Sequence, residues 1–461
     1  MIYVRKKQMI IKWVASIGIP VLLYMLIPES TVVTGSIKMY ISITAFTILM
    51  WVLNTLPPVI TGLVMSLLYI FCNVSNGNVV FSSWTNQIVW LCTGGVIIAL
   101  AFEKTGLMKR IAYKIIYKTG CSYKGIIIGL IASGIVMAII LPNITARVTL
   151  YAALAFGICK ALNIPSNTKT GAGIMMAGFI GAIGSRTMLL SGWDNLVLSY
   201  GLIENFEAPS TMKFFMCNIL PTLVWCAIMA VTIMVLFKQD VQFEGKDYFK
   251  EEVKKSGKMT SKEWKFLLIL LAAVLGLFFT QYAIGWLFLA AACLCFFPGI
   301  DILGSEDVKN INFTIIIFIA SAMTIGNVAT DLQIGTLVGN ALVNTLANIQ
   351  ITNTGMMMIA WLFGVIMDFL MTPVAALSAF SVPIASICEQ LGFSISGVLY
   401  SFIWGVEQFI FPYEWALFLV VYGYGMITSK DTLKFGLARM ILSFVFMLII
   451  LVPCWTLLGF K

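Results

Sequence analysis

The sequence predicts an all-α polytopic membrane protein, built from two inverted-topology repeats with about 11 transmembrane helices plus two re-entrant hairpins. The first sign is composition: of 461 residues, 60% are hydrophobic and 11% are charged, whereas soluble domains carry about 25% charged residues. The second is a series of apolar segments near the roughly 20 residues that a bilayer crossing needs. The third is a break in two such segments, at Pro142-Asn143 and at Thr372-Pro373. Broken helices persist in lipid only where protein or a water-filled cavity lines them, which is where transporters bind cargo.

Charge and residue types exclude several classes of function. The formal charge is +9, but the 29 Lys and Arg residues lie mostly in short loops between apolar segments, as the positive-inside rule requires of a membrane protein. Histidine is absent, which excludes histidine zinc sites and Ser-His-Asp triads. The ten cysteines lack metal or redox spacing. We therefore expect no enzyme activity, no nucleic-acid partner and no resident cofactor.

The first repeat is predicted to cover residues 1–237. A basic cluster at residues 5–7 precedes an apolar segment without a cleavage site, so we expect a retained first span and a cytoplasmic N-terminus. A basic amphipathic helix is expected at the membrane surface between Glu103 and Lys124. Four spans are expected before it, near Ile10–Ile27, Ile37–Leu56, Val59–Val74 and Ile88–Phe102.

The first hairpin is predicted over residues 125–162. This stretch is long enough for two half-crossings, and basic loops on both sides place both of its ends in the cytoplasm. A crossing over Gly171–Tyr200 follows, interrupted between Ser191 and Asn195, and a span near Phe214–Phe237 returns the chain to the cytoplasm.

Residues 238–265 carry mixed charge and are predicted to be a cytoplasmic linker, and residues 266–461 form the second repeat. Its hairpin, residues 355–391, should enter from the outside, because the loop around Asp331 before it lacks Lys and Arg. Inverted repeats of this kind place cargo and ions at the midplane, here of the cytoplasmic (inner) membrane. The other expected spans are Phe266–Thr280, Ala283–Pro298, Ile311–Ala329, an interrupted Gly397–Thr428 and Ile441–Leu458. This order of spans leaves the C-terminus outside. It places Lys430, Lys434 and Arg439 in a cytoplasmic loop.

The segment from Phe81 to Lys124 resembles the first-half segment of the divalent anion:sodium symporter family, the permeases that carry dicarboxylates, citrate and sulfate. Weaker similarity extends to both hairpins, to Gly192 and Asn195, and to Val421–Asp431. The resemblance implies an alternating-access carrier of elevator or rocking type. It also implies a small anionic substrate, a homodimer and Na⁺ as a coupling ion.

Members of that family carry a Ser-Asn-Thr triplet at each hairpin tip, where it holds sodium and substrate carboxylates. The first triplet falls on residues 142–144, of which Asn143 matches. The second falls on residues 373–375, where nothing matches, although Thr372 stands one residue earlier. Ser166-Asn167-Thr168 spells the triplet but is expected to form a turn before a helix in a cytoplasmic loop.

The two unwound loops of the family usually read Gly-Thr-Pro-x-Asn. The first loop of this chain keeps Gly192 and Asn195, and the second, residues 411–418, keeps neither. Because the second half departs furthest from the family pattern, coupling to sodium, to protons or to a counter-anion stays open, with protons or exchange favoured.

A dianion in a membrane needs positive potential. Helix N-termini after Asn143, Asn195 and Thr372 present unpaired N–H groups, and Arg147 and Arg186 add full charges that suit a carboxylate or sulfate. The residues predicted to bind substrate are Asn143, Ile144, Thr145, Arg147, Gly192, Asn195, Thr372 and Pro373.

The alternative is that each arginine is neutralised by an acid and only braces the fold. The expected partners are Asp194 for Arg186 and an acid of the other half for Arg147. Buried acids near the breaks can also carry a proton. Candidates for the coupling ion, Na⁺ or H⁺, are Asn143, Gly192, Asp368 and Glu414, and candidate charge partners are Arg186, Asp194 and Glu407.

The predicted function is secondary active transport of a small di- or tricarboxylate of the succinate, malate, citrate or tartrate type. One alternative is a carrier of an inorganic anion such as sulfate or arsenite. The other is a sensor or scaffold that keeps the carrier fold and no longer transports.

Overall fold

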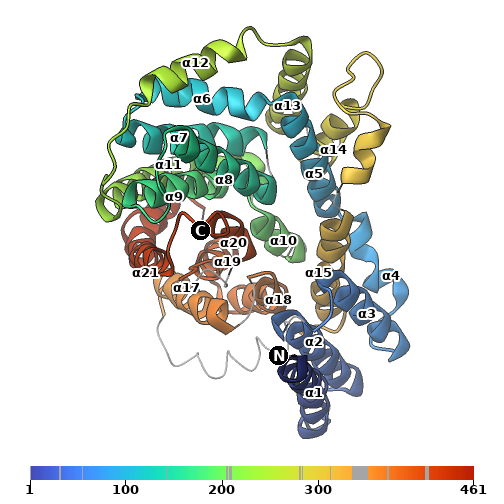
Figure 1. Ribbon diagram of the computed structural model, residues 1–461. Helices are drawn as coiled ribbons and strands as arrows, with labels where there is room; N and C mark the ends of the chain where they lie inside the picture. The colour runs from blue at the N-terminus through green and yellow to red at the C-terminus, as the bar shows by residue number, and fades with distance from the viewer. Residues whose placement is uncertain are drawn as a thin grey trace.

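The computed structural model describes residues 2–460 without 31–32, 54, 142, 204–205, 207–209, 280–281, 283, 312, 335–350, 371–372 and 411–414. The described residues form helices joined by turns and loops (Figure 1). The first five helices and a short helical turn are α1 (Ile2–Leu26), α2 (Gly35–Leu53), α3 (Pro58–Phe71), α4 (Gly77–Val80), η1 (Ser82–Thr85) and α5 (Gln87–Thr105). The next are α6 (Leu107–Thr119), α7 (Tyr123–Ile140), α8 (Ile144–Ala161), α9 (Lys169–Ile183), η2 (Arg186–Met188), η3 (Leu190–Gly192), α10 (Asp194–Leu202) and α11 (Thr211–Leu236).

The remaining elements follow the polar linker. They are α12 (Lys246–Ser256), α13 (Ser261–Phe279), α14 (Ile284–Leu294), η4 (Ser305–Asn310), α15 (Phe313–Asp331), α17 (Asn353–Leu370), α18 (Pro373–Leu391), α19 (Ile395–Gly405), α20 (Ala416–Tyr422), α21 (Ser429–Phe446), η5 (Met447–Leu451) and α22 (Val452–Leu458).

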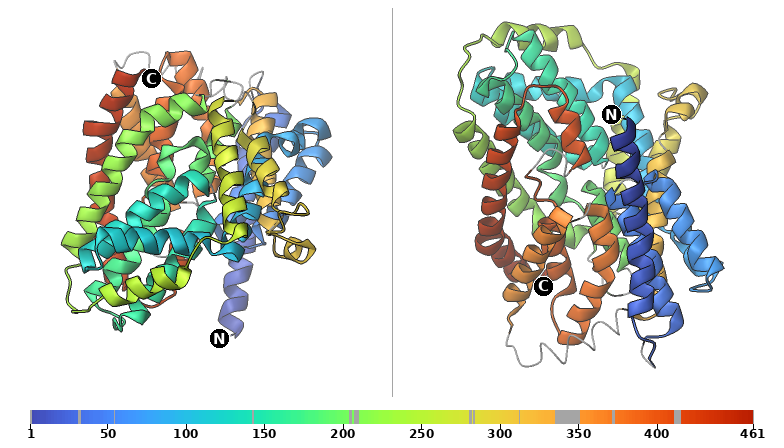
Figure 2. Two further views of the ribbon diagram at one scale, coloured as in Figure 1. Left: turned by 90° about the horizontal axis from the view of Figure 1, so that it is seen from above. Right: turned by 60° about the horizontal axis from the view of Figure 1, so that its bottom comes forward.

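Most of the helices fall into two groups, and α6 and α12 lie together beside them. The outer group contains α1–α5 and α13–α15, and the hairpin group contains α7–α11 and α17–α22. Within the outer group, α1 lies beside α2 at the edge of the molecule and projects beyond its neighbours (Figure 2). Leu22 and Met25 of α1 are more than half exposed, as expected of side chains that face lipid.

Four helical stretches among the described residues are long and apolar enough to cross a membrane by themselves. They are Tyr123–Ile140, Ile144–Ala161, Thr211–Leu236 and Ser429–Leu458. The α5–α6 pair meets the same test as one unit but is bent by 67°, at Gly106, whose φ is +69°. The number of crossings, their inverted order and the re-entrant form of the hairpins stay predictions.

Several helices begin where the sequence places a hydroxyl before an apolar run. The side chains of Ser122, Thr168 and Ser394 each accept a hydrogen bond from the backbone N–H three residues later, at the starts of α7, α9 and α19. Such caps satisfy one of the unpaired N–H groups of a first helical turn. The role of Thr168 confirms that Ser166-Asn167-Thr168 forms a turn before a helix.

The two broken helix pairs pack in the same way. Both α7 and α8 contact α9, and both α17 and α18 contact α19. Glycines allow the closest approaches, because a Cβ on Gly134 would lie 1.9 Å from the Gly181 oxygen, and one on Gly364 would lie 2.9 Å from the Gly405 Cα. The halves also exchange contacts, since α10 packs against α18 and α20 packs against α8.

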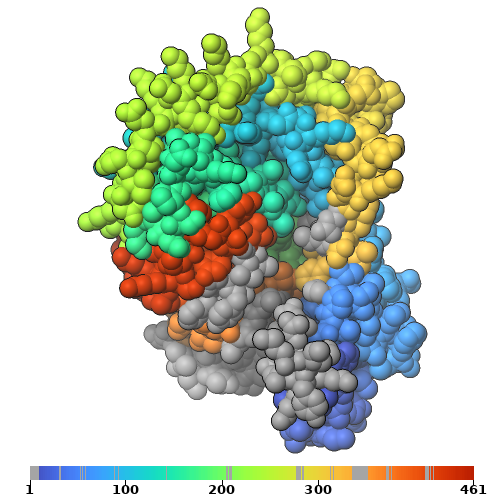
Figure 3. Space-filling model, in the orientation of Figure 1, coloured from blue at the N-terminus to red at the C-terminus, as the bar shows by residue number. Residues whose placement is uncertain are grey.

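The polar linker contains a helix of its own, α12, where the sequence predicted a polar loop. This helix lies over α6 along one edge of the molecule (Figure 3). A buried ion pair holds the turn that follows it: Arg110 Nε donates to Glu263 Oε1 at 2.6 Å, and Arg110 Nη1 donates to the Gly257 oxygen at 2.9 Å.

Two predicted boundaries are wrong. The first interrupted crossing unwinds from Gly184, not from Ser191, because α9 ends at Ile183 and two short 3₁₀ turns follow. Arg186 therefore lies within the unwound segment. The last helix starts at Ser429, not near Ile441, and runs as 30 residues to Leu458. Arg439 consequently lies about three turns inside a helix rather than in a cytoplasmic loop.

Candidate functional site

The tip of the first broken pair is built around Asn143. This residue caps α8, since its side-chain oxygen accepts a hydrogen bond from the Ala146 N–H at 2.8 Å. The backbone N–H of Ile144, the first residue of α8, bonds to the carboxylate of Asp194. The tip is therefore tied to the start of α10, across the first unwound segment.

A cavity of about 330 Å³ lies between α5 and α8. Asn143 and Thr145 line it on the hairpin side, together with Thr149 one turn further along α8. Its other walls are mainly apolar, and Glu103 of α5 borders it. The volume lies within the range of about 300–1,000 Å³ that is common for small-molecule sites. The cavity therefore lies between the outer group, to which α5 belongs, and the hairpin group, to which α8 belongs.

Arg147 lies one turn beyond the tip and is completely buried. Its Nη2 donates a hydrogen bond to the backbone oxygen of Gly192 in the first unwound segment. Its Nε and Nη1 have no hydrogen-bond partner among the described residues. The carboxylate of Asp194 lies close enough for the two charges to attract. Arg147 thus faces α9 and α10, on the side of α8 away from the cavity.

Arg186 forms a buried ion pair with Glu407, which comes from the second half of the chain. The Glu407 carboxylate also accepts a hydrogen bond from Trp193 Nε1 at 2.8 Å and one from the Asn195 side-chain amide. The Arg186 guanidinium lies 4.0 Å from the centre of the Trp193 ring and 5.2 Å from that of Trp415. These three partners all present N–H groups to the carboxylate.

A third buried arginine, Arg439, completes the cluster. Its Nη1 donates to the backbone oxygen of Glu407 at 2.7 Å, and its guanidinium stacks on Phe409 at 4.8 Å. Asp368 of α17 accepts a hydrogen bond from the Gln408 N–H at 3.0 Å and attracts Arg439 electrostatically. Three arginines and three acids therefore face one another within the hairpin group, and their formal charges cancel.

The expected charge pairs need correction. The sequence suggested Asp194 for Arg186 and an acid of the other half for Arg147. The structure instead pairs Arg186 with Glu407 of the other half and places Asp194 beside Arg147. The reason is that α8 brings Arg147 to the start of α10, whereas Glu407, just after the end of α19, lies at Arg186.

Some predicted residues lie elsewhere or outside the described part. Thr372 and Glu414 are outside the described residues, as is Pro142. Pro373 is buried and begins α18. Trp193 and Arg439 were not predicted as site residues from the sequence. For Arg439, its distance from the helix start at Ser429 was a usable signal that it lies inside a helix.

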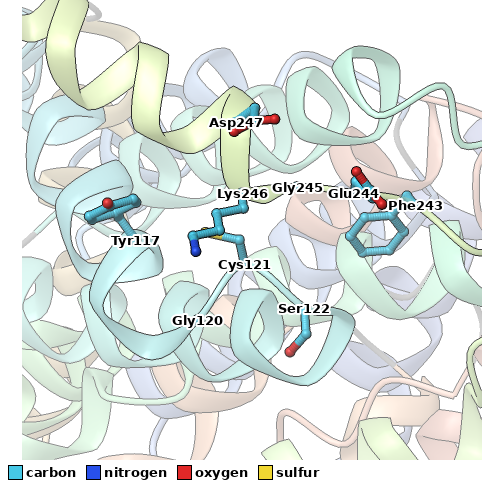
Figure 4. A pocket seen from close by; sticks show the side chains of 9 residues that line it. All are labelled: Tyr117, Gly120, Cys121, Ser122, Phe243, Glu244, Gly245, Lys246 and Asp247. Carbon is cyan, nitrogen blue, oxygen red and sulfur yellow. The ribbon is translucent and has the colours of Figure 1, made fainter.

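A second open cavity, larger than the one beside α8, lies outside this group of residues. Its volume is about 690 Å³, and it is bounded by the end of α6, the start of α7 and the segment before α12 (Figure 4). Lys246 and Tyr117 line it, and no predicted site residue does.

Broken helices that gather balanced charges inside a multi-pass helical protein define a membrane transporter. The family model described as "Sodium:sulfate symporter transmembrane region" matches residues 7–460. The chain belongs to this family, which is a family of anion transporters and not of enzymes. The predicted resemblance is therefore confirmed.

Relatives with known names are distant. Sodium-dependent dicarboxylate transporter SdcS of Staphylococcus saprophyticus is 26% identical over 248 residues, 50% of this chain and 47% of that protein. The chloroplastic Dicarboxylate transporter 1 of Spinacia oleracea is 28% identical over 192 residues, 40% of this chain and 34% of that protein. The matches thus span less than half the length of these curated relatives.

One solved structure shares the fold. The crystal structure of the Alcanivorax borkumensis YdaH transporter aligns with a TM-score of 0.56, over 81% of this chain and 85% of that chain, at 11% identity. The chain is therefore an all-helical multi-pass membrane protein with a fold like that of the YdaH transporter.

Proposed function

We propose that this chain carries a small di- or tricarboxylate across the membrane by alternating access, with the hairpin group moving against the outer group. The observation that carries the proposal is the cavity of about 330 Å³ at the tip of α8, which lies on the boundary between the two groups. The distant relatives named as dicarboxylate transporters support this class of cargo.

In the proposed bound state, one carboxylate of the cargo meets Asn143, Thr145 and the positive end of α8. An 18-residue helix carries a partial positive charge at its start. Arg147 and Gly192 hold the tip from behind, with Ile144 and Asn195 bonded into the same cluster. Thr372 and Pro373 are proposed to serve the second tip.

The cavity lining favours a carbon skeleton over sulfate. Leu100 of α5 and Ala153 of α8 are among the apolar residues that line the cavity with Asn143 and Thr145. A compact inorganic dianion has no apolar surface to bury against such a wall, whereas the methylene groups of succinate do. Sulfate and arsenite stay as the alternative cargo, and a transport-inactive sensor as the alternative role.

The same repeat of packing that joins α7, α8 and α9, and then α17, α18 and α19, supports two inverted repeats over residues 1–237 and 266–461. We also propose a homodimer in the inner membrane, with the N-terminus inside and the C-terminus outside.

The test is uptake of labelled succinate, citrate and sulfate into proteoliposomes loaded with the same unlabelled anion. We expect succinate or citrate to exchange, and Thr145→Val to lower the rate about tenfold through loss of a hydrogen bond to charge. The matched control is Thr232→Val on α11, a membrane-helix threonine outside the cavity, whose hydroxyl bonds within its own helix. Absence of exchange for every anion contradicts transport, and faster exchange of sulfate than of the organic anions contradicts the carboxylate.

A further inference from the structure

We infer that Glu103 of α5 sets how much negative charge the cavity beside α8 admits, so that this chain binds dicarboxylates in preference to tricarboxylates. The inference rests on the proposed function, because it concerns the cargo of the same cavity. It adds a residue that determines specificity to the residues that hold the cargo.

One side of α5 forms a wall of this cavity. Val96, Ala99, Leu100 and Glu103 line it, at spacings of three and four residues that place side chains on the same side of a helix. The first three are apolar, whereas Glu103 is the last of the row and is exposed. Among the described residues that line the cavity, Glu103 is the only one with a charged side chain. A cavity proposed to hold an anion therefore contains a carboxylate.

The cations that follow Glu103 in the chain do not neutralise it. Lys104, Lys109 and Arg110 each form an ion pair with a different acid, at distances of 2.5, 3.8 and 2.6 Å. The three acids are, in the same order, Asp307, Glu252 and Glu263. The part of the chain that the structure describes shows no ion pair of Glu103, so its charge acts on whatever enters the cavity.

The positive charge beside the cavity is arranged differently. Asn143 and Thr145 lie at the start of α8, where a helix carries a partial charge of about half a unit. The full charge of Arg147 lies on the other side of α8, where its Nη2 is bonded to the Gly192 oxygen. This end of α8 suits one carboxylate of a cargo. Each further anionic group meets repulsion from Glu103 without a full positive charge in the described lining to offset it.

The size of the cavity keeps the whole cargo within range of this repulsion. A compact space of about 330 Å³ is roughly 9 Å across, so every carboxylate of a bound cargo lies near the wall that Glu103 belongs to. Two unit charges about 9 Å apart, at an effective dielectric constant between about 20 and 80, change an equilibrium constant by about two- to twentyfold. A trianion therefore binds several-fold more weakly, relative to a dianion, than it would without Glu103.

The test compares anions of different charge at about pH 8, where succinate is a dianion and citrate is a trianion. Unlabelled succinate or citrate competes with labelled succinate for exchange into proteoliposomes. Three proteins are compared: wild type, Glu103→Gln and Glu29→Gln. Glu103→Gln keeps the size of the side chain and removes its charge. Glu29→Gln is the matched control, because it removes an exposed acid between α1 and α2 that does not line the cavity.

The measured quantity is the half-inhibitory concentration of citrate divided by that of succinate. We expect this ratio to exceed one in the wild type, to fall by about fivefold in Glu103→Gln and to stay unchanged in Glu29→Gln. A merely structural role for Glu103 would weaken both anions alike and leave the ratio as it is. A fall of less than about twofold in Glu103→Gln, or a wild-type protein that prefers citrate, overturns the inference.

Two further measurements keep the inference testable. Glu103→Lys should lower the ratio beyond the value for Glu103→Gln, and it decides the question if the glutamine variant does not fold. If no anion exchanges, the proposed function fails, and binding is then measured as the rise in unfolding temperature that each anion causes. Glu103→Gln should increase the rise with citrate relative to the rise with succinate. An unchanged relation between the two, or no rise with either anion, overturns the inference.

Discussion

Residues 184–193 follow α9 and residues 406–410 follow α19, each after a helix that packs against both arms of a broken pair. The two segments hold the same place in the order of helices, but their chemistry is opposite. The first contributes the cation Arg186 and the donor Trp193, and the second contributes the anion Glu407, which both of them contact.

This difference teaches which features a structural repeat preserves. Glycine contacts recur in both halves because helix spacing depends on them. The Arg186–Glu407 contact is not symmetric, because two like charges brought together at the boundary between the halves would repel in a region of low dielectric. One half therefore carries the positive partner and the other half the negative one.

The largest effect is expected from Glu407→Gln, which keeps the shape of the side chain and removes its charge. A buried Arg186 without its partner should cost about 3–5 kcal/mol of stability. Thermal unfolding in detergent measures it. The double variant Arg186→Met with Glu407→Gln should recover more than half of the loss, whereas Lys255→Met, at an exposed ion pair, should change little. Equal losses in the single and double variants would show that the ion pair is not the cause.

Substitution of a buried contact glycine should lower the stability of the protein equally in the two halves. Gly134→Ala and Gly364→Ala each force a Cβ against backbone atoms of the neighbouring helix, which should cost about 1–3 kcal/mol. Gly157→Ala on α8 is the control, because a Cβ there meets nothing within 4 Å. Unfolding temperatures that fall for only one of the two buried glycines would contradict the equivalence of the packing.

Substitutions of the two tryptophans beside Arg186 should lower the stability of the protein by different amounts. Trp193→Phe keeps an aromatic ring near the guanidinium but loses the 2.8 Å hydrogen bond to Glu407, at a cost of about 1–2 kcal/mol. Trp415→Phe removes no described bond to Glu407 and should cost less than about 1 kcal/mol. Chemical unfolding of both variants tests this order, and the reverse order would mean that ring packing outweighs the hydrogen bond.

The smallest effect concerns Asp240, whose carboxylate caps the start of α9. Burial acts to raise the pKa of this group, but hydrogen bonds from Thr170 and Lys169 outweigh it and hold the pKa below its usual range. A lowered folded-state pKa means that the stabilisation is present above the unfolded pKa of about 3.9 and is lost as the pH falls through the folded value. Asp240→Asn should therefore lower the unfolding temperature by about 1–2 °C at pH 7.

The difference between wild type and Asp240→Asn should shrink as the pH falls below about 4. Unfolding scans of both proteins from pH 7 to the lowest pH that the detergent tolerates measure it. A difference that stays constant with pH would show that the carboxylate charge plays no part in the cap.

Much of the fold could be predicted from local sequence. The break at Asn143 was visible because a proline and an amide interrupt an apolar run, and the structure ends α7 at Ile140 and begins α8 at Ile144. The start of the unwinding at Gly184 was not visible, because residues 184–190 contain no proline or asparagine that would end a helix. Local composition therefore located the breaks that proline or asparagine marks but not the one at Gly184.

The candidate site was only partly predictable. Arg147 and Arg186 stood out because charges are rare in apolar segments. Arg439 did not, because two lysines precede it closely and together they resemble a cytoplasmic loop. The pairing of Arg186 with Glu407 had no local signal at all, since the two residues come from different halves of the chain.

By itself, the sequence determined that this protein is an all-helical membrane transporter of an anion:sodium symporter family, with breaks at defined positions. Hydropathy and helix-breaking residues act locally, and lipid enforces them on every segment separately. The tertiary structure alone decided which arginine meets which acid. Those outcomes depend on how α8, α10 and α19 cross, and electrostatic pairing in a low dielectric depends on distances of a few ångströms that no spacing along the chain specifies.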